Sequence, residues 1–175
     1  PCISAGSAGA ERSSASPPWK SMADSTPARC ALRRAKSSMR KDTSLAEIGT
    51  ALTRVPEGFD LHKTVGRLLD TKAEMFRTGK GFDWATAEAL AFGRLATEGF
   101  PVRLSGQDCT RGTFSQRHSA FVDQTTEERF YPLNHIRAGQ ARYEVIDSML
   151  SEYAVLGFEY GYSLAEPNAL TLWEA

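Results

Sequence analysis

The stretch D-S-M-L-S-E-Y-A-V-L-G-F-E-Y-G-Y-S, residues 147–163, decides the fold of this chain. It begins at the end of a candidate strand and continues as a predicted helix with one carboxylate, Glu152, in its first turn. Residues 154–158 follow without a charge, and a helix that is apolar on nearly every face is normally buried. We therefore expect this helix to lie inside the protein, with Glu152 at its amino-terminal end.

Two hypotheses fit Glu152. An acid in the first turn stabilises its own helix, because the helix dipole favours negative charge there. Alternatively, burial against apolar neighbours raises the pKa of a carboxyl group, so that Glu152 could share a proton with a bound heterocycle. Spacing alone favours the first hypothesis, and the second needs support from other parts of the chain.

The residues around this stretch alternate between helix and strand patterns. Asp83 can cap a helix that ends at Gly99. Strands are expected at 102–106, 142–148 and 170–173, and such alternation is typical of an α/β fold. The apolar face of the helix that begins after the cap consists of Trp84, Ala87, Ala91 and Leu95.

Polar residues stand directly after the first strand, where open α/β sheets bind ligands. Gln107 and Asp108 follow Gly106, and two interpretations stay open for them: part of a binding site, or a polar turn. Histidine is the natural acid–base group near neutral pH, so His118 is a candidate, although a hydrogen-bonded loop residue is the simpler interpretation. Cys109 has no histidine partner in this pattern, and we interpret it as a passive neighbour.

Two segments precede the α/β part. Residues 1–43 are rich in Ser, Ala, Arg and Pro and lack apolar periodicity, so we expect a disordered or foreign tail. Within residues 44–80, Ser44 predicts the start of one helix through a capping box, and Asp60 predicts the cap of a second. These helices form a predicted helical hairpin that leads into a domain at 81–175.

Composition and charge narrow the classes of protein. Residues 1–43 carry eight Lys or Arg against three Asp or Glu, and residues 44–175 carry 13 against 18. A mildly acidic domain argues against nucleic acid as its main ligand. No apolar run approaches the roughly 20 residues of a membrane helix. The three cysteines are widely spaced, which favours a reducing compartment: the cytoplasm, or the mitochondrial matrix in a eukaryote.

Several runs occur in order along residues 44–175. They are V-P-E-G-F (55–59), D-W-A-T-A-E-A-L-A-F-G (83–93), P-V-R-L-S-G-Q-D (101–108), R-G-T-F-S-Q-R-H-S (111–119), Y-P-L-N-H (131–135), L-S-E-Y-A-V-L-G-F-E-Y-G-Y-S (150–163) and L-T-L-W-E-A (170–175). Through these runs the chain resembles the first, thiamine-diphosphate-dependent component of 2-oxoglutarate dehydrogenase complexes. The resemblance implies a truncated transketolase-like α/β domain that binds the pyrimidine ring of thiamine diphosphate.

The resemblance also implies roles for individual residues. Glu152 would hydrogen-bond a nitrogen of the aminopyrimidine, and Gln107, Asp108 and Phe158 would help to bind the cofactor. His118 matches a histidine near the reacting carbons, so it would be catalytic together with Glu152. For Phe158, core packing or a subunit contact remains the alternative. The ligands of Mg²⁺ are expected outside this chain.

The family relationship implies the substrate and the partners as well. The complete enzyme would decarboxylate 2-oxoglutarate oxidatively and pass the succinyl group to the dihydrolipoyl succinyltransferase component, acting as a homodimer. We expect the chain alone to be inactive. The alternatives are a related thiamine-dependent 2-oxo acid decarboxylase or carboligase, and a non-catalytic fragment that only contacts other subunits.

Overall fold

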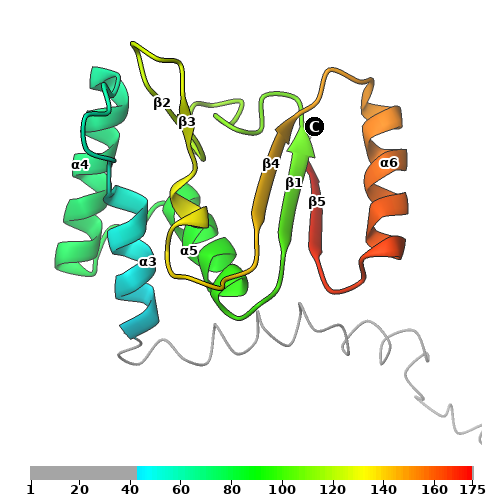
Figure 1. Ribbon diagram of the computed structural model, residues 1–175, viewed down its shortest axis with the longest axis horizontal. Coiled ribbons are helices and arrows are strands. Elements are labelled where there is room, and N and C mark those ends of the chain that lie inside the picture. Colours follow the sequence, from blue (N-terminus) through cyan, green and yellow to red (C-terminus); the bar gives the residue numbers. More distant parts are fainter. Residues whose placement is uncertain (1–42, 175) are drawn as a thin grey trace, which may run out of the picture.

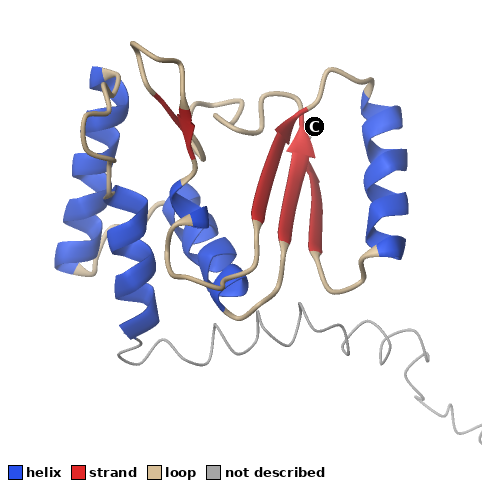
Figure 2. Ribbon diagram, in the orientation of Figure 1, coloured by secondary structure: helices blue, strands red, loops and turns tan. Residues whose placement is uncertain are grey.

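The computed structural model describes residues 43–174, and the tail predicted for residues 1–43 lies outside this part except for Thr43. Helices α3 to α5 precede a short parallel sheet, and α6 lies between the last two strands in the chain (Figures 1 and 2). The helices are α3 (Thr43–Thr53), α4 (Lys63–Thr78), α5 (Trp84–Thr97) and α6 (Glu152–Ala165), with a short 3-10 helix η1 (Pro132–Asn134). The strands are β1 (Val102–Gly106), β2 (Phe121–Val122), β3 (Arg129–Phe130), β4 (Tyr143–Asp147) and β5 (Leu170–Glu174).

The main sheet has three parallel strands in the order β4-β1-β5, and each lies where the sequence predicted a strand. Val102 pairs with Tyr143 on one side and Leu170 on the other, so the carboxyl ends of all three strands lie at one edge. β2 and β3 form a separate antiparallel pair, which the sequence did not predict. The α/β fold class is confirmed.

The helices lie in layers around this sheet. Figure 1 shows α5 on one side of the three strands and α6 on the other, with the α3–α4 hairpin packed beyond α5. The predicted helical hairpin is therefore present. The hydrophobic core fills the α5 side, and its buried members are Ile48, Leu52, Phe92, Leu95, Val102, Leu104, Cys109, Leu133, Tyr143 and Val145.

Two of the three predicted helix caps are wrong. Ser44 lies inside α3, where its hydroxyl accepts a hydrogen bond from Arg94. Asp60 does not cap α4, because the cap is His62, whose Nδ1 accepts from the Thr64 N–H at 3.2 Å. The backbone N–H of Asp60 instead donates to Asp123. The prediction for α5 is confirmed: Asp83 accepts from the Thr86 N–H at 2.7 Å.

The buried face of α5 matches the predicted one in part: Leu95 is buried as expected, but Trp84 and Ala87 are exposed. Trp84 is 92 % exposed, and its neighbour Ala85 is buried instead. Phe92 determines this rotation, because its ring stacks on Tyr143 of β4 with 5.7 Å between the centroids. The buried residues of the helix are Ala85, Thr86, Phe92, Gly93, Leu95 and Ala96.

Helix α6 is not enclosed by the described residues, and the prediction of a buried helix is wrong for them. Only Val155 and Glu159, one turn apart, are buried. A three-stranded sheet covers a single stripe of a helix, and no other described element covers the remaining faces of α6. Its exposed large apolar side chains are Tyr153, Leu156, Phe158, Tyr160 and Leu164. None of the helices in residues 43–174 combines the length and apolar character of a membrane span.

Candidate functional site

Strand β1 ends with a glycine that leaves no room for a side chain. A Cβ atom at Gly106 would lie 1.9 Å from the carbonyl oxygen of Glu174 on the neighbouring strand. Three non-glycine residues of the following segment, Asp108, Ser115 and His118, have φ angles of 55°, 54° and 47°. Positive φ angles are unfavourable for residues with a side chain, and such residues cluster at functional sites. The loop at 107–118 is therefore the first candidate for a site.

A cleft at the carboxyl edge of the sheet brings together two of the predicted site residues, Gln107 and Glu152. Its wall combines carboxylate and amide groups with apolar surface, which suits a flat heterocycle with polar edges. The lining residues are Gln107, Leu150, Ser151, Glu152, Val155, Trp173 and Glu174.

Glu152 is exposed, so the burial that was expected for it is wrong within residues 43–174. It is the first residue of α6, and the side chain of the capping residue Ser151 makes no capping hydrogen bond. The first N–H groups of α6 therefore favour a negative charge beside the cleft. Its role in binding a cofactor stays a prediction.

The other predicted residues lie away from this cleft. Phe158 is exposed and lies by Arg103, whose guanidinium carbon is 5.4 Å from the ring centroid. Asp108 forms an ion pair with Arg111 inside its own loop. His118 lines a separate small cavity, with room for little more than a water molecule, together with Lys72 and Glu88.

His118 is half-buried, and its surroundings favour the neutral imidazole. Burial lowers the pKa of His118, and the charge of Lys72 lowers it further. A hydrogen bond with the backbone of Ser115 and the carboxylate of Asp108 act in the opposite direction, while Arg111 adds to the lowering. A neutral histidine can accept a proton, which is the state that a general base requires.

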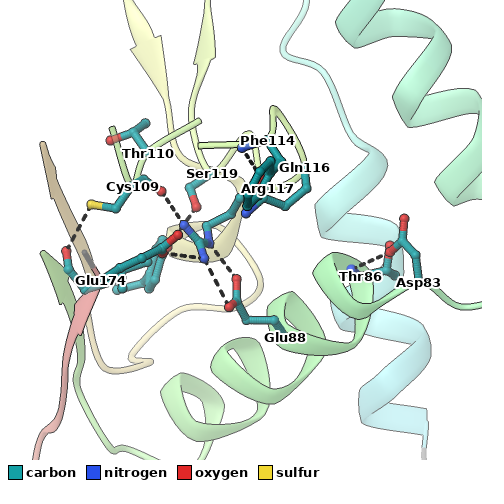
Figure 3. A network of polar contacts seen from close by, with 12 residues as sticks. Asp83, Thr86, Glu88, Cys109, Thr110, Phe114, Gln116, Arg117, Ser119 and Glu174 are labelled. Atoms are coloured by element: carbon teal, nitrogen blue, oxygen red, sulfur yellow. Dashed lines mark hydrogen bonds and ion pairs between the residues drawn. The ribbon is translucent and has the colours of Figure 1, made fainter. Parts of the chain in front are cut away.

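Arg117 connects the loop to both neighbouring elements (Figure 3). Its guanidinium bonds Glu88 of α5 at 2.5 Å and Glu174 of β5 at 2.6 Å, and it donates to the Cys109 carbonyl at 2.7 Å. Burial opposes its charge, but these two carboxylates raise the pKa of Arg117 above its usual value. The network fixes Arg117, and with it the start of the peptide that leads to His118, between α5 and the end of β5.

Sequence reasoning missed this network, although Arg117 lies in one of the runs that carry the family resemblance. Its partners are 29 and 57 residues away along the chain, and no periodicity relates the three positions. The same applies to Arg103, which pairs with Glu144 of β4 and Glu159 of α6. Buried arginines that join distant carboxylates leave no local signal.

Cys109 is a passive neighbour, as predicted. It is fully buried, and its thiol donates to the Ile146 carbonyl at 3.0 Å. Burial, with the carboxylate of Asp147 adding to it, raises the pKa of the Cys109 thiol to about 12. Such a thiol is not nucleophilic near neutral pH. Across residues 43–174 there is also no group of three His, Cys, Asp or Glu side chains that could hold a metal ion.

Comparison with known proteins gives a family match over the second half of the chain and longer matches to individual proteins. Residues 80–175 match the family described as transketolase, pyrimidine binding domain. Over 143 residues, the chain is 60 % identical to the 2-oxoglutarate dehydrogenase E1 component of Brucella anthropi and 59 % identical to that of Brucella canis. Over 132 residues, it is 61 % identical to that of Brucella ovis.

These relatives are much longer than the chain. The matched residues cover 82 % of this chain but 14 % of the Brucella anthropi and Brucella canis proteins. For the Brucella ovis protein the two shares are 75 % and 13 %.

Proposed function

Because the chain belongs to the transketolase pyrimidine-binding domain family, we propose that it is part of a 2-oxoglutarate dehydrogenase E1 component and forms half of its thiamine diphosphate site. The observation that carries this proposal is the identity of 59–61 % to three proteins of that name. The matched 143 residues are more than residues 80–175 contain, so the likeness reaches into the hairpin that precedes the family domain.

The complete protein would decarboxylate 2-oxoglutarate oxidatively and pass the succinyl group to the lipoyl arm of a dihydrolipoyl succinyltransferase component. Thiamine diphosphate, when bound, supplies the carbon that attacks the 2-oxo group and the electron sink for decarboxylation. A reducing compartment suits the buried free thiol of Cys109, so the proposed location is the cytoplasm, or the mitochondrial matrix in a eukaryote.

The cleft fits one part of this cofactor. Glu152 and Gln107 offer a carboxylate and an amide to the polar edge of an aminopyrimidine, while Val155 and Trp173 offer apolar surface to its face. No lysine or arginine lines this cleft among the described residues, so it does not fit a diphosphate. The ligands of the diphosphate and of Mg²⁺ would come from parts of the complete protein outside this chain.

Glu152 would act as the hydrogen-bond partner of the ring, holding a proton between its carboxyl group and a ring nitrogen. The exposed position of Glu152 means that a second wall is needed to exclude water. In the complete protein, a second subunit of a homodimer would supply that wall. For the same reason we expect the chain alone to be inactive towards 2-oxoglutarate.

The test is Glu152→Gln in the complete protein, with Glu47→Gln as the matched control, because Glu47 is also exposed near the start of a helix. Loss of one charge-assisted contact in a water-excluded site should lower kcat about 100-fold or more. Titration with thiamine diphosphate, followed by circular dichroism, should show weaker binding at an unchanged melting temperature. A lower melting temperature with normal activity would instead assign Glu152 a role in stability alone.

Two other functions remain alternatives, and each predicts a different experimental result from the proposed function. A related enzyme that acts on another 2-oxo acid would turn over 2-oxoadipate in preference to 2-oxoglutarate. A non-catalytic interaction fragment is favoured by the exposed apolar side chains of α6, such as Tyr153 and Leu164. It would predict that Glu152→Gln leaves every kinetic constant of the complete protein unchanged.

A further inference from the structure

Lys72 occupies an unusual position in the middle of α4. Lys72 is only 5 % exposed, whereas a lysine is almost never fully buried without a partner. Its ammonium group donates to the carbonyl oxygen of Arg117 at 3.5 Å, a contact that spans 45 residues of sequence. A buried ammonium with one long hydrogen bond is costly, so the position calls for an explanation beyond packing.

The groups around Lys72 come from two helices and the loop. Burial lowers the pKa of Lys72, while the carboxylates of Asp83 and Glu88 at the start of α5 oppose that change and favour the charged form. None of the described carboxylates forms an ion pair with it. The charge of Lys72 is therefore not neutralised by a direct partner, and it acts on the cavity that it shares with His118.

The backbone at His118 depends on its neighbours. The N–H groups of Arg117 and His118 both donate to the carbonyl of Arg111, at 2.9 and 3.0 Å, and His118 has a φ of 47°. Residues with this φ persist only when surrounding contacts hold them. The bond from Lys72 reaches the carbonyl of the peptide that joins Arg117 to His118, so α4 adds one of these contacts.

We propose that Lys72 is a positioning residue for His118: it tethers the Arg117–His118 peptide and lines the same small cavity as the imidazole. A positive charge at this place favours the neutral, proton-accepting imidazole. This inference rests on the proposed function and on the catalytic role that the family resemblance implies for His118, in which its imidazole would handle a proton of the substrate-derived group. It gives α4, which precedes the matched residues 80–175, a part in positioning His118.

The test compares three variants of the complete protein without cofactor. Lys72→Met removes both the charge and the tether. Lys72→Gln removes the charge and keeps a hydrogen-bond donor, and it decides the question if the Met variant does not fold. Lys63→Met is the matched control, because Lys63 lies exposed at the start of the same helix.

The measurement is the pH dependence of hydrogen exchange at the imidazole C2 position of His118, followed by mass spectrometry of the peptide that contains it. Removal of a nearby positive charge should raise the titration midpoint of His118 by about half a pH unit or more in both Lys72 variants. In the same variants loaded with thiamine diphosphate, the acidic limb of kcat/KM should move to higher pH by the same amount. Lys63→Met should change neither quantity.

The outcomes separate this inference from the proposed function. An unchanged His118 midpoint in Lys72→Gln overturns the positioning role, whatever happens to activity. Normal turnover by His118→Gln refutes a proton-transfer role for His118, while a shifted midpoint in the Lys72 variants still supports the contact with Lys72. A shifted midpoint together with a shifted acidic limb supports both.

Discussion

Replacement of Glu159 by alanine, Glu159→Ala, should loosen α6 from the sheet. Arg103 of β1 donates to both carboxylate oxygens of Glu159, at 2.8 and 3.0 Å, and to Glu144 of β4 at 2.7 Å. The side chains of Arg103 and Glu159 are 11 % and 5 % exposed. Among the described residues, this is the ion pair through which α6 contacts the sheet.

The size of the effect follows from this geometry. Removing one partner of a buried ion pair costs about 3–5 kcal/mol, because the other charge stays buried without compensation. Glu144 remains bonded to Arg103, so the lower end of that range applies, about 3 kcal/mol. At 1.4 kcal/mol per factor of ten, opening of α6 should become about 100-fold more frequent.

Amide hydrogen exchange of α6 in the complete protein measures this opening directly, because local opening of one element does not require global unfolding. The backbone amides around Val155 and Glu159 should lose about 100-fold of their protection. Glu144→Gln is the control: Glu144 makes one of the three bonds and is more exposed, so its effect should be about 1 kcal/mol or less. Equal protection in the wild type and Glu159→Ala would refute the reasoning.

Three further predictions concern the loop and the strand edge. Gly106→Ala should destabilise the fold by about 2–4 kcal/mol, because the added methyl group would collide with Glu174. Gly157→Ala is the control and should not destabilise the fold, since its methyl group would lie in open space. Thermal unfolding of the two variants measures the difference. Cys109 should resist alkylation by iodoacetamide at pH 8 in the folded protein. At that pH a thiol with a pKa of about 12 is deprotonated in only about one molecule in ten thousand. Unfolding in urea should expose Cys109 to alkylation. Hydrogen bonds from the N–H groups of Thr126 and Asp60 lower the pKa of Asp123 in the folded protein. Asp123 therefore stabilises the fold fully above the ordinary aspartate pKa of about 4, and this stabilisation is lost as pH falls through the lower pKa of the folded state. The melting temperature of Asp123→Asn should therefore fall less steeply than that of the wild type between about pH 5 and pH 3.

The α/β architecture could be predicted because its signals are local. The Asp83 cap, the glycine at position 99 and the short strand at Val102–Gly106 each follow from residues within a few positions of one another. The position of Glu152 at the start of α6 followed in the same way. The resemblance to a family was carried by ordered runs of sequence and was supported by the comparisons.

Burial could not be predicted in the same way. The apolar composition of α6 predicted an enclosed helix, yet composition does not say which elements are present to cover it. On α5, Leu95 is buried as predicted, but Phe92, which stacks on Tyr143, lies on the buried face in place of the predicted Trp84. Both differences arise because burial depends on partners that are distant in sequence.

By itself, the sequence determined the order of the helices and of the three strands of the main sheet, which residues stand at the carboxyl edge of that sheet, and which family the chain resembles. Only the tertiary structure decided that Gln107 and Glu152 share a cleft, that His118 lies beside Lys72, and that Arg117 joins α5 to β5. The physical reason is the sequence separation of the interacting residues. Caps, turns and periodic patterns depend on residues that are close together along the chain. Ion pairs and burial are set by neighbours in space, which the folded chain brings together from far apart in the sequence.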